Sequence, residues 1–237
     1  MPPHIYLVRH GQGYHQLEPT DRNQYLPDPA LTDEGIDRCK YFAKQFPKAV
    51  HLDLICASPL QRTIQTAKYT FAERLEQIAP IVLLPYAQEA TDLPSDTGSE
   101  RAVIEQWFGK LVDASLVEEG WNSNAGIYAP TPEALKQRAS KLRAWLQARP
   151  EKTVAVVGHG NFWHYLTGEV DENGKQTSKS FLPLRECGRE EILLTWIIAP
   201  YWSNNEWRSY TFLEAGEDGS VVLQEDGESV ARREKPN

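Results

Sequence analysis

The sequence predicts an α/β fold, a three-layer α/β/α sandwich with a mostly parallel central sheet. Short apolar runs at residues 4–9, 52–56, 81–84 and 153–157 have the length and β-branched content of strands. Stretches of helical spacing separate these runs, an alternation that is typical of parallel sheets covered on both faces. At 237 residues the chain can bury a sizeable core, so we expect one domain with an insertion.

The first strand is expected over residues 4–9, and the glycines that follow, beginning with Gly11, predict a loop. A helix should then begin after Thr32, whose hydroxyl suits the N-cap position. Apolar side chains recur at helical spacing as far as Phe46, and Pro47 ends the helix.

The second strand, at 52–56, leads into Ser58 and Pro59. Ser58 is expected to cap a helix that has Pro59 at its first position and that runs to about Glu73. A third strand over 81–84 should follow this helix.

Residues 85–130 are rich in Pro, Asp, Ser and Gly at their start, with a helix-like stretch around 99–118. We interpret 85–130 as an inserted lid region that covers the site. A helix over 132–148 and a strand over 153–157 then resume the alternating pattern.

The C-terminal part of the sequence is less regular. Residues 190–199 fit a strand or a buried helical turn, and 206–213 fit another strand. We therefore expect one domain over 1–213. Residues 214–237 are mostly charged or small and predict a flexible polar tail.

Composition excludes several partner classes. Lys and Arg number 25 against 33 Asp and Glu, a net charge of -8, so we expect neither nucleic acid nor an anionic membrane as a partner. No apolar run approaches the roughly 20 residues that span a bilayer, and the N-terminus lacks a secretory signal pattern. Cys39, Cys56 and Cys187 are too few and too scattered for a disulfide framework or a zinc site, which fits a cytoplasmic protein with buried thiols.

Two histidines follow predicted strands directly. His10 comes after the first strand and His159 after the strand at 153–157, and both have glycine neighbours. Ligands of open α/β sheets bind beyond the carboxyl ends of the strands. Arg9 adjoins His10, and Arg62 lies about one turn into a helix that follows another strand, so the four side chains form a cationic pocket suited to phosphate.

This set of side chains suits phosphoryl transfer. A neutral imidazole can attack phosphorus and form a phosphohistidine, while arginines and a second histidine stabilise the equatorial oxygens. The leaving alkoxide needs a proton, for which Glu89, just beyond the third strand, is the first candidate and Asp92 the second.

Three segments of the sequence resemble the signatures of the histidine phosphatase superfamily, in its phosphoglycerate mutase-like branch. They are Leu7-Val8-Arg9-His10-Gly11, the stretch from Ala57 to Ala67 that contains Ser58-Pro59-Leu60-Gln61-Arg62, and Gly158-His159-Gly160. They occur in the family's order and spacing, and the similarity spans roughly residues 4–168. Asp92 to Gly98 and Trp207 to Phe212 further resemble a fungal subgroup of that branch.

The resemblance implies that His10 is the phosphorylated nucleophile, that Arg9, Arg62 and His159 complete the phosphate pocket, and that Glu89 donates the proton. It also implies that no metal or organic cofactor is needed. The family often carries Asn six residues after the nucleophile, where this chain has Gln16, whose longer amide can still reach the phosphate.

Further expectations concern the pocket wall and the reaction. Tyr14, His15 and Asp92 are possible pocket residues. The expected substrate is a small phosphorylated metabolite, and the expected assembly is a monomer or a homodimer. Hydrolysis is preferred to a mutase reaction because the 85–130 segment offers only Arg101 and Lys110 as bases. Two further alternatives are a binding or assembly module and non-phosphate chemistry on a small acidic molecule.

Overall fold

The central feature of the computed structural model is one seven-stranded sheet, in the order β4-β3-β2-β5-β1-β6-β7. The structure describes residues 1–17, 23–78, 80–177, 202–213 and 221–233. The segment 190–199, for which the sequence left a strand or a helical turn open, lies outside these residues. Within them the α/β prediction is confirmed.

Five neighbouring strands of the sheet are parallel, and β6 and β7 are antiparallel to their neighbours. The strands are β1 (His4–Arg9), β2 (Leu54–Ala57), β3 (Ile81–Leu83), β4 (Val112–Asp113), β5 (Thr153–Gly158), β6 (Trp207–Phe212) and β7 (Leu223–Glu225). Because β1, β2, β3 and β5 run the same way, their carboxyl ends meet at one edge of the sheet, where the predicted site residues lie.

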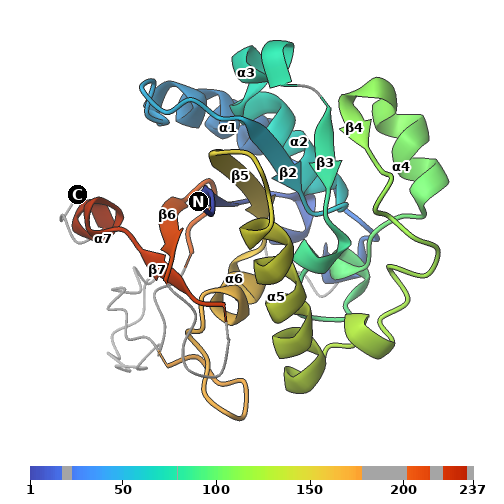
Figure 1. The fold of residues 1–237 in the computed structure, drawn as a ribbon. Helices are drawn as coiled ribbons and strands as arrows, with labels where there is room; N and C mark the ends of the chain where they lie inside the picture. The colour runs from blue at the N-terminus through green and yellow to red at the C-terminus, as the bar shows by residue number, and fades with distance from the viewer. Residues whose placement is uncertain (18–22, 79, 178–201, 214–220, 234–237) are drawn as a thin grey trace, which may run out of the picture.

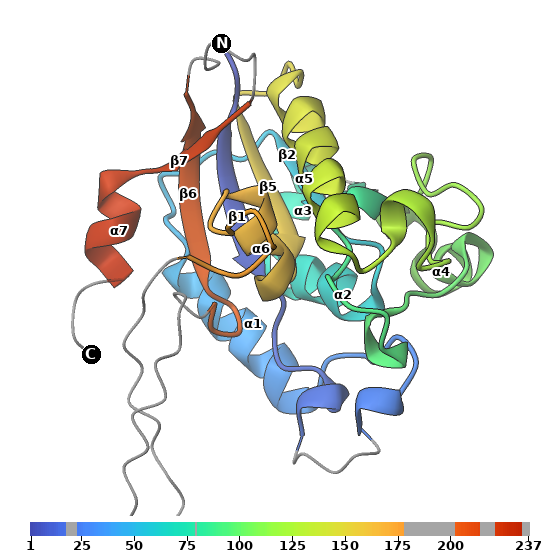
Figure 2. The same ribbon diagram turned by 90° about the horizontal axis from the view of Figure 1, so that it is seen from below.

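Helices cover both faces of the sheet, which gives the three layers visible in Figures 1 and 2. The helices are α1 (Asp33–Gln45), α2 (Gln61–Thr70), α3 (Ala72–Ile78), α4 (Arg101–Phe108), α5 (Pro132–Gln147), α6 (Gly160–Leu166) and α7 (Gly227–Arg233). Helices α1, α2 and α3 pack on one face, and α5 and α6 pack on the other.

The two hydrophobic cores follow from the alternation of side chains along the strands. In β1, Tyr6 and Val8 face the α1 and α2 side, whereas Ile5 and Leu7 face α5 and α6. All four are buried. A strand that is apolar on both faces therefore marks a central position in the sheet.

The first helix begins as predicted, because the Thr32 hydroxyl accepts a hydrogen bond from the Gly35 amide at 2.9 Å. The second helix was predicted wrongly in two respects. Ser58 does not cap it, since α2 begins at Gln61 and the Ser58 amide still donates to the Val157 carbonyl at the end of the sheet. The helix also breaks at Phe71, whose ring is fully buried against Phe46, so that α2 and α3 are separate.

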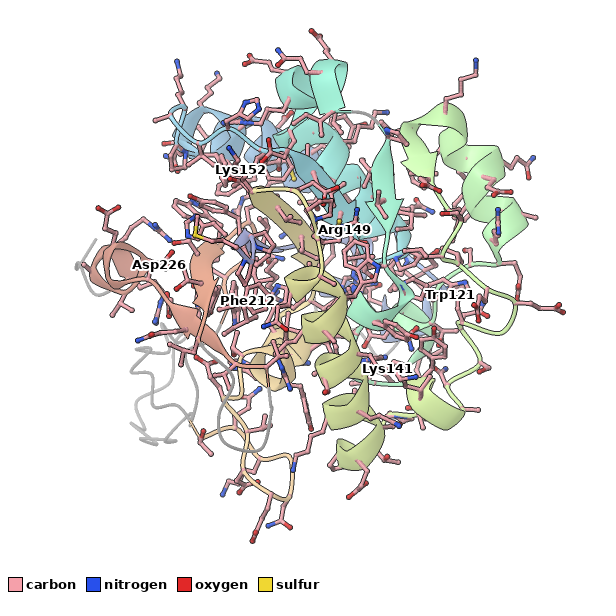
Figure 3. The ribbon with its side chains drawn as sticks, viewed as in Figure 1. Trp121, Lys141, Arg149, Lys152, Phe212 and Asp226 are labelled. Atoms are coloured by element: carbon pink, nitrogen blue, oxygen red, sulfur yellow. The ribbon has the colours of Figure 1, made fainter. Side chains whose placement is uncertain are left out.

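The inserted segment 85–130 is more closely joined to the sheet than expected. Its helix α4 is shorter than the predicted 99–118 stretch, and Val112–Asp113 form the edge strand β4 beside β3. Trp121, labelled in Figure 3, is buried and packs against Gly98 of the same segment. That the segment acts as a lid stays a prediction.

The prediction of a flexible tail from residue 214 is wrong for residues 221–233, which contain β7 and α7. Leu223 is buried, and the strand pairs with β6. Glu225 and Arg233 form an ion pair at 2.6 Å. Asp226, labelled in Figure 3, forms a hydrogen bond with His4. Pairing with β6 supplies stability that local composition does not reveal.

Candidate active site

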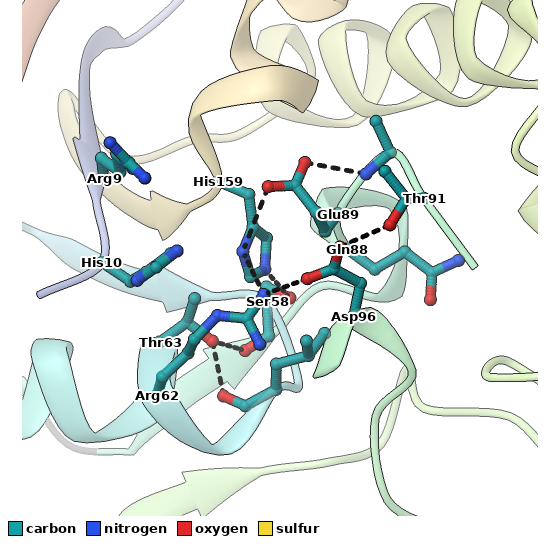
Figure 4. Close-up of polar contacts among 12 residues, drawn as sticks. Arg9, His10, Ser58, Arg62, Thr63, Gln88, Glu89, Thr91, Asp96 and His159 are labelled. Atoms are coloured by element: carbon teal, nitrogen blue, oxygen red, sulfur yellow. Dashed lines mark hydrogen bonds and ion pairs between the residues drawn. The ribbon is translucent and has the colours of Figure 1, made fainter. Parts of the chain in front are cut away.

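The two predicted histidines lie side by side at the carboxyl edge of the sheet. Strands β1 and β5 are parallel neighbours, with Arg9 opposite Gly158 in register, so the next residues, His10 and His159, leave the sheet together. Their ring centroids are 5.2 Å apart, and both side chains are buried. Figure 4 shows them with Arg9, Arg62 and Glu89 around one space.

The ring of His10 has a defined tautomer. Its Nδ1 lies 2.7 Å from the Gly11 carbonyl oxygen, which can only accept, so Nδ1 carries the hydrogen and Nε2 presents a lone pair. Burial first, and then the charges of Arg62, Arg9 and His15, hold the pKa of His10 well below its usual value. A neutral imidazole with a lone pair on Nε2 is the form that can attack phosphorus.

Arg62 is fully buried in the first turn of α2 and is held by three partners. It donates to the Ser95 carbonyl at 2.5 Å and to Asp96 Oδ1 at 2.8 Å. The same terminal nitrogen that binds Asp96 lies 3.2 Å from His159 Nδ1. Because guanidinium has no acceptor, His159 Nδ1 accepts here.

His159 precedes α6 and is also fixed on its other side. Its Nε2 lies 3.0 Å from the Ser58 hydroxyl, to which it donates when Nδ1 accepts from Arg62. Burial and the nearby charge of Arg62 lower the pKa of His159 well below its usual value. A bound phosphate would raise the pKa of His159 and so oppose burial and Arg62, since an anion favours the protonated ring.

Glu89 is buried and lies opposite His159, with Oε2 at 4.0 Å from Nδ1. Its Oε1 accepts a hydrogen bond from the Ala90 amide at 2.8 Å. Burial, and then the charge of Asp96, raise the pKa of Glu89 to about 7. A carboxyl group that keeps its proton near neutral pH is suited to protonate a leaving oxygen.

Arg138 of α5 anchors the backbone beneath this carboxyl group. It is buried, donates to the carbonyls of Gln88 and Glu89 at 3.0 and 2.8 Å, and lies over the Phe162 ring. Its contacts position Glu89 through the main chain.

The remaining predicted residues lie around the pocket at different depths. Arg9 donates to the Trp202 carbonyl, and the ring of His15 is 5.7 Å from that of His10. The Gln16 amide oxygen accepts from the Gly13 amide and from Asn204, each at 3.1 Å. Tyr14 is 43% exposed.

Asp92 is exposed and lies beside Pro94, Thr97 and Glu100 in a separate cavity, whereas Glu89 faces His159. This placement favours Glu89 over Asp92 as the proton donor.

Sequence reasoning missed Ser58, Asp96 and Arg138 as parts of the site. Ser58 was assigned to a helix cap, although its position at the end of β2 was a signal that it faces the crevice. Asp96 and Arg138 lie 34 and 49 residues from their site partners Arg62 and Glu89, and no local pattern marks them.

Neither a candidate metal site nor a membrane-spanning helix is found within the described ranges. No three His, Cys, Asp or Glu side chains within them are grouped so as to hold a metal ion. No helix within them is both long enough and apolar enough to cross a membrane.

A family model and several named proteins are similar to this chain. The model of the histidine phosphatase superfamily (branch 1) matches residues 5–188. A Schizosaccharomyces pombe protein named "Probable phosphatase SPAC513.02" is 29% identical over 159 residues, which cover 66% of this chain and 73% of that protein. The Arabidopsis thaliana "Phosphoglycerate mutase-like protein 1" is 24% identical over 259 residues, covering 92% and 85%.

A solved structure shares the fold at low identity. The native structure of a mycobacterial glucosyl-3-phosphoglycerate phosphatase superposes with a TM-score of 0.54 and 18% identity, covering 94% of this chain and 97% of that one.

Proposed function

Since the chain belongs to the histidine phosphatase superfamily (branch 1), we propose that it hydrolyses a small phosphate monoester through a phosphohistidine on His10, without a metal ion. The observation that carries the proposal is the placement of the His10 ring, whose Nδ1 donates to the Gly11 carbonyl and whose Nε2 keeps its lone pair beside Arg62 and His159. The lowered pKa of His10 supports it. The names of the phosphatase relatives support the same reaction.

In the first step, His10 Nε2 attacks phosphorus and the bond between phosphorus and the ester oxygen breaks. Arg9, Arg62 and His159 surround the equatorial oxygens and stabilise their charge. Glu89 gives its proton to the leaving oxygen, so that an alcohol departs instead of an alkoxide.

In the second step, the Glu89 carboxylate takes a proton from water as the water oxygen attacks phosphorus. The bond between phosphorus and Nε2 breaks, inorganic phosphate leaves, and Glu89 is protonated again. The hydrogen bond from Nδ1 to Gly11 keeps the ring oriented through both steps.

Hydrolysis is favoured over transfer to a second hydroxyl by the placement of the bases in the 85–130 segment. Arg101 is exposed and pairs with Glu105 at 2.8 Å, and Lys110 is also exposed. Within the part of the chain that the structure describes, no hydrogen bond or ion pair joins either of them to His10, Arg62 or His159, which supports hydrolysis. A mutase is the second candidate because two relatives carry phosphoglycerate mutase-like names.

The cellular location and the oligomeric state of the protein are part of the same proposal. Cys39 and Cys56 are buried free thiols, which supports a reducing, cytoplasmic location. A monomer or a homodimer acting on a small phosphorylated metabolite fits a site built wholly from one chain.

The test is a panel of phosphomonoesters assayed with and without a chelator, using the wild-type protein and His10→Ala. We expect phosphate release that the chelator leaves intact and that His10→Ala abolishes. Activity that survives the substitution would refute the nucleophile, and loss of activity on chelation would refute the metal-free reaction. Transfer between two hydroxyls of one substrate without free phosphate would identify a mutase.

A further inference from the structure

A second carboxylate, Asp96, lies inside the site next to Arg62 and Glu89 (Figure 4). We propose that Asp96 is a positioning residue that fixes Arg62 and, by its negative charge, favours the proton-donating form of the neighbouring Glu89, so that Asp96 sets the pH range of the reaction. This inference rests on the proposed function for its kinetic consequence, but its electrostatic part concerns the protein alone.

The contact with Arg62 is direct and shielded from water. Asp96 Oδ1 accepts from the Arg62 guanidinium at 2.8 Å, and the exposed fractions of the two side chains are 11% and 0%. The neighbouring Ser95 carbonyl accepts from the other terminal nitrogen. Two acceptors on adjacent residues hold the guanidinium plane in one orientation, with one nitrogen toward His159.

Asp96 is itself held in place. The Thr91 hydroxyl donates to its Oδ2 at 2.5 Å. Asp28 joins the end of the same loop to the start of α2, because it accepts from the Ser99 hydroxyl at 2.7 Å and from the Gln61 amide at 2.8 Å. The carboxylate therefore has a fixed location relative to Arg62 and Glu89.

The charge of Asp96 also acts directly on Glu89, which lies near it in the site (Figure 4). After burial, Asp96 is the largest cause of the raised pKa of Glu89, because two nearby carboxylates resist being ionised together. Arg62, Arg9 and the hydrogen bond from the Ala90 amide oppose it. The charged or titratable groups around Glu89 are Asp96, Arg62, Arg9, His159 and Arg138.

The sign of the effect is definite. Removing the Asp96 charge lowers the pKa of Glu89, so a smaller fraction of Glu89 is protonated at pH 7. Proton donation should then fail at a lower pH than in the wild type. Substrates with poor leaving groups should be affected most, because they depend most on the donated proton.

The electrostatic part can be tested without substrate. We would follow the carboxyl ¹³C signal of Glu89 through a pH titration, assigning it by its loss in Glu89→Gln. Asp96→Asn keeps the shape and the acceptor for Arg62, and Asp96→Ser is a second neutral variant; folding of each is checked by amide spectra. Glu100→Gln, an exposed charge change on the same segment, is the matched control.

We expect the midpoint of the Glu89 titration to move to lower pH in both Asp96 variants and to be unchanged in Glu100→Gln. An unchanged midpoint in folded Asp96→Asn would overturn the inference. An equal fall in Glu100→Gln would also overturn it, because the effect would then not be specific to the charge of Asp96.

The kinetic part uses alkyl phosphates and p-nitrophenyl phosphate with the same variants. For alkyl phosphates, Asp96→Asn should move the alkaline limb of the kcat/KM profile to lower pH. It should reduce kcat/KM at pH 8 by roughly threefold or more. p-Nitrophenyl phosphate should be less affected. If the midpoint of the Glu89 titration falls while the pH profile for alkyl phosphates is unchanged, Asp96 does not set the pH range of the reaction. If the protein has no phosphatase activity, the proposed function fails, and the NMR titration still tests the electrostatic part of the inference.

Discussion

At the scale of single residues, the site depends on hydrogen bonds that fix the tautomer or the orientation of each histidine ring. The Gly11 carbonyl fixes the His10 tautomer, and the Ser58 hydroxyl and Arg62 fix His159 from opposite sides. For Glu89, burial and the charge of Asp96 also act on the protonation state, because they raise its pKa to about 7.

Ser58→Ala tests the support of His159. The substitution removes the hydroxyl 3.0 Å from Nε2 and leaves a buried donor without its partner. We expect kcat to fall about two- to twelvefold, the equivalent of the roughly 0.5–1.5 kcal/mol that one such hydrogen bond contributes. Ser58→Thr, which retains a hydroxyl, is the control, and an unchanged kcat in Ser58→Ala would contradict this role.

Glu89→Gln tests the proton donor. The amide keeps the shape but cannot donate a proton in the first step, so kcat/KM for an alkyl phosphate, which reports that step, should fall roughly 10²–10⁴-fold. The fall in kcat/KM should be much smaller for p-nitrophenyl phosphate, and the alkaline limb near pH 7 should disappear. The measurement is a pair of pH profiles; an equal loss with both substrates would point away from acid catalysis.

Arg9, His10, Arg62 and His159 could be predicted from the sequence because each is anchored to a local pattern, a strand end or a helix start. Asp96 could not, since its role depends on where a long loop returns to α2. The same limit explains the error at Ser58: a Ser-Pro pair is a common helix start, and only the position of His159 shows that the hydroxyl is used elsewhere.

At the scale of elements, the loop after β1 is held against the start of α1. Gln12 accepts hydrogen bonds from the Thr32 amide and, through its side chain, from the Thr32 hydroxyl. Gly35 allows this close approach, because a Cβ there would lie 2.2 Å from the Gln12 carbonyl oxygen. The first helix thus supports the loop that carries His10.

Gly35→Ala should therefore destabilise the protein by about 1–3 kcal/mol, the usual cost of forcing an atom into a packed site. It should also lower kcat, because the backbone must shift next to His10. Gly227→Ala, at the start of α7, is the matched control, since no atom lies within 4 Å of the place that its Cβ would occupy. Urea denaturation of both variants measures the difference; equal stabilities would contradict the close packing.

The strands and α1 were predicted well because their signals are local. The tail was not, because β7 gains its stability from β6 and from the Glu225 and Arg233 ion pair. Similarly, two residues of the 85–130 segment become β4 only because β3 offers an edge.

At the scale of the whole molecule, the cationic pocket links folding to pH. His10 and His159 are buried with lowered pKa values, so they are neutral in the folded protein. In the unfolded chain they take up protons below about pH 6.5. Glu89 has the opposite effect, because its folded pKa of about 7 exceeds its unfolded value, so the folded state holds that proton more tightly.

The free energy of unfolding should consequently fall as the pH is lowered from about 6.5 towards 5. His10 and His159 each contribute up to about 1.4 kcal/mol per pH unit, His15, whose pKa is lowered to about 3, adds to the same decline, and the Glu89 proton offsets one of the three. Glu89→Gln should steepen this decline and His10→Asn should make it shallower. Urea denaturation at several pH values gives the slopes, and an identical slope in all three proteins would rule out this linkage.

The central claim is that His10 Nε2 carries the phosphoryl group. The most direct measurement is rapid acid-free quenching after mixing with a ³²P-labelled phosphomonoester, followed by peptide mapping. We predict a base-stable, acid-labile phosphate on the peptide that contains His10, absent in His10→Ala and longer-lived in Glu89→Gln when an aryl phosphate is the donor. Turnover of the same substrate with no label on His10, or with label on another residue, would contradict the account.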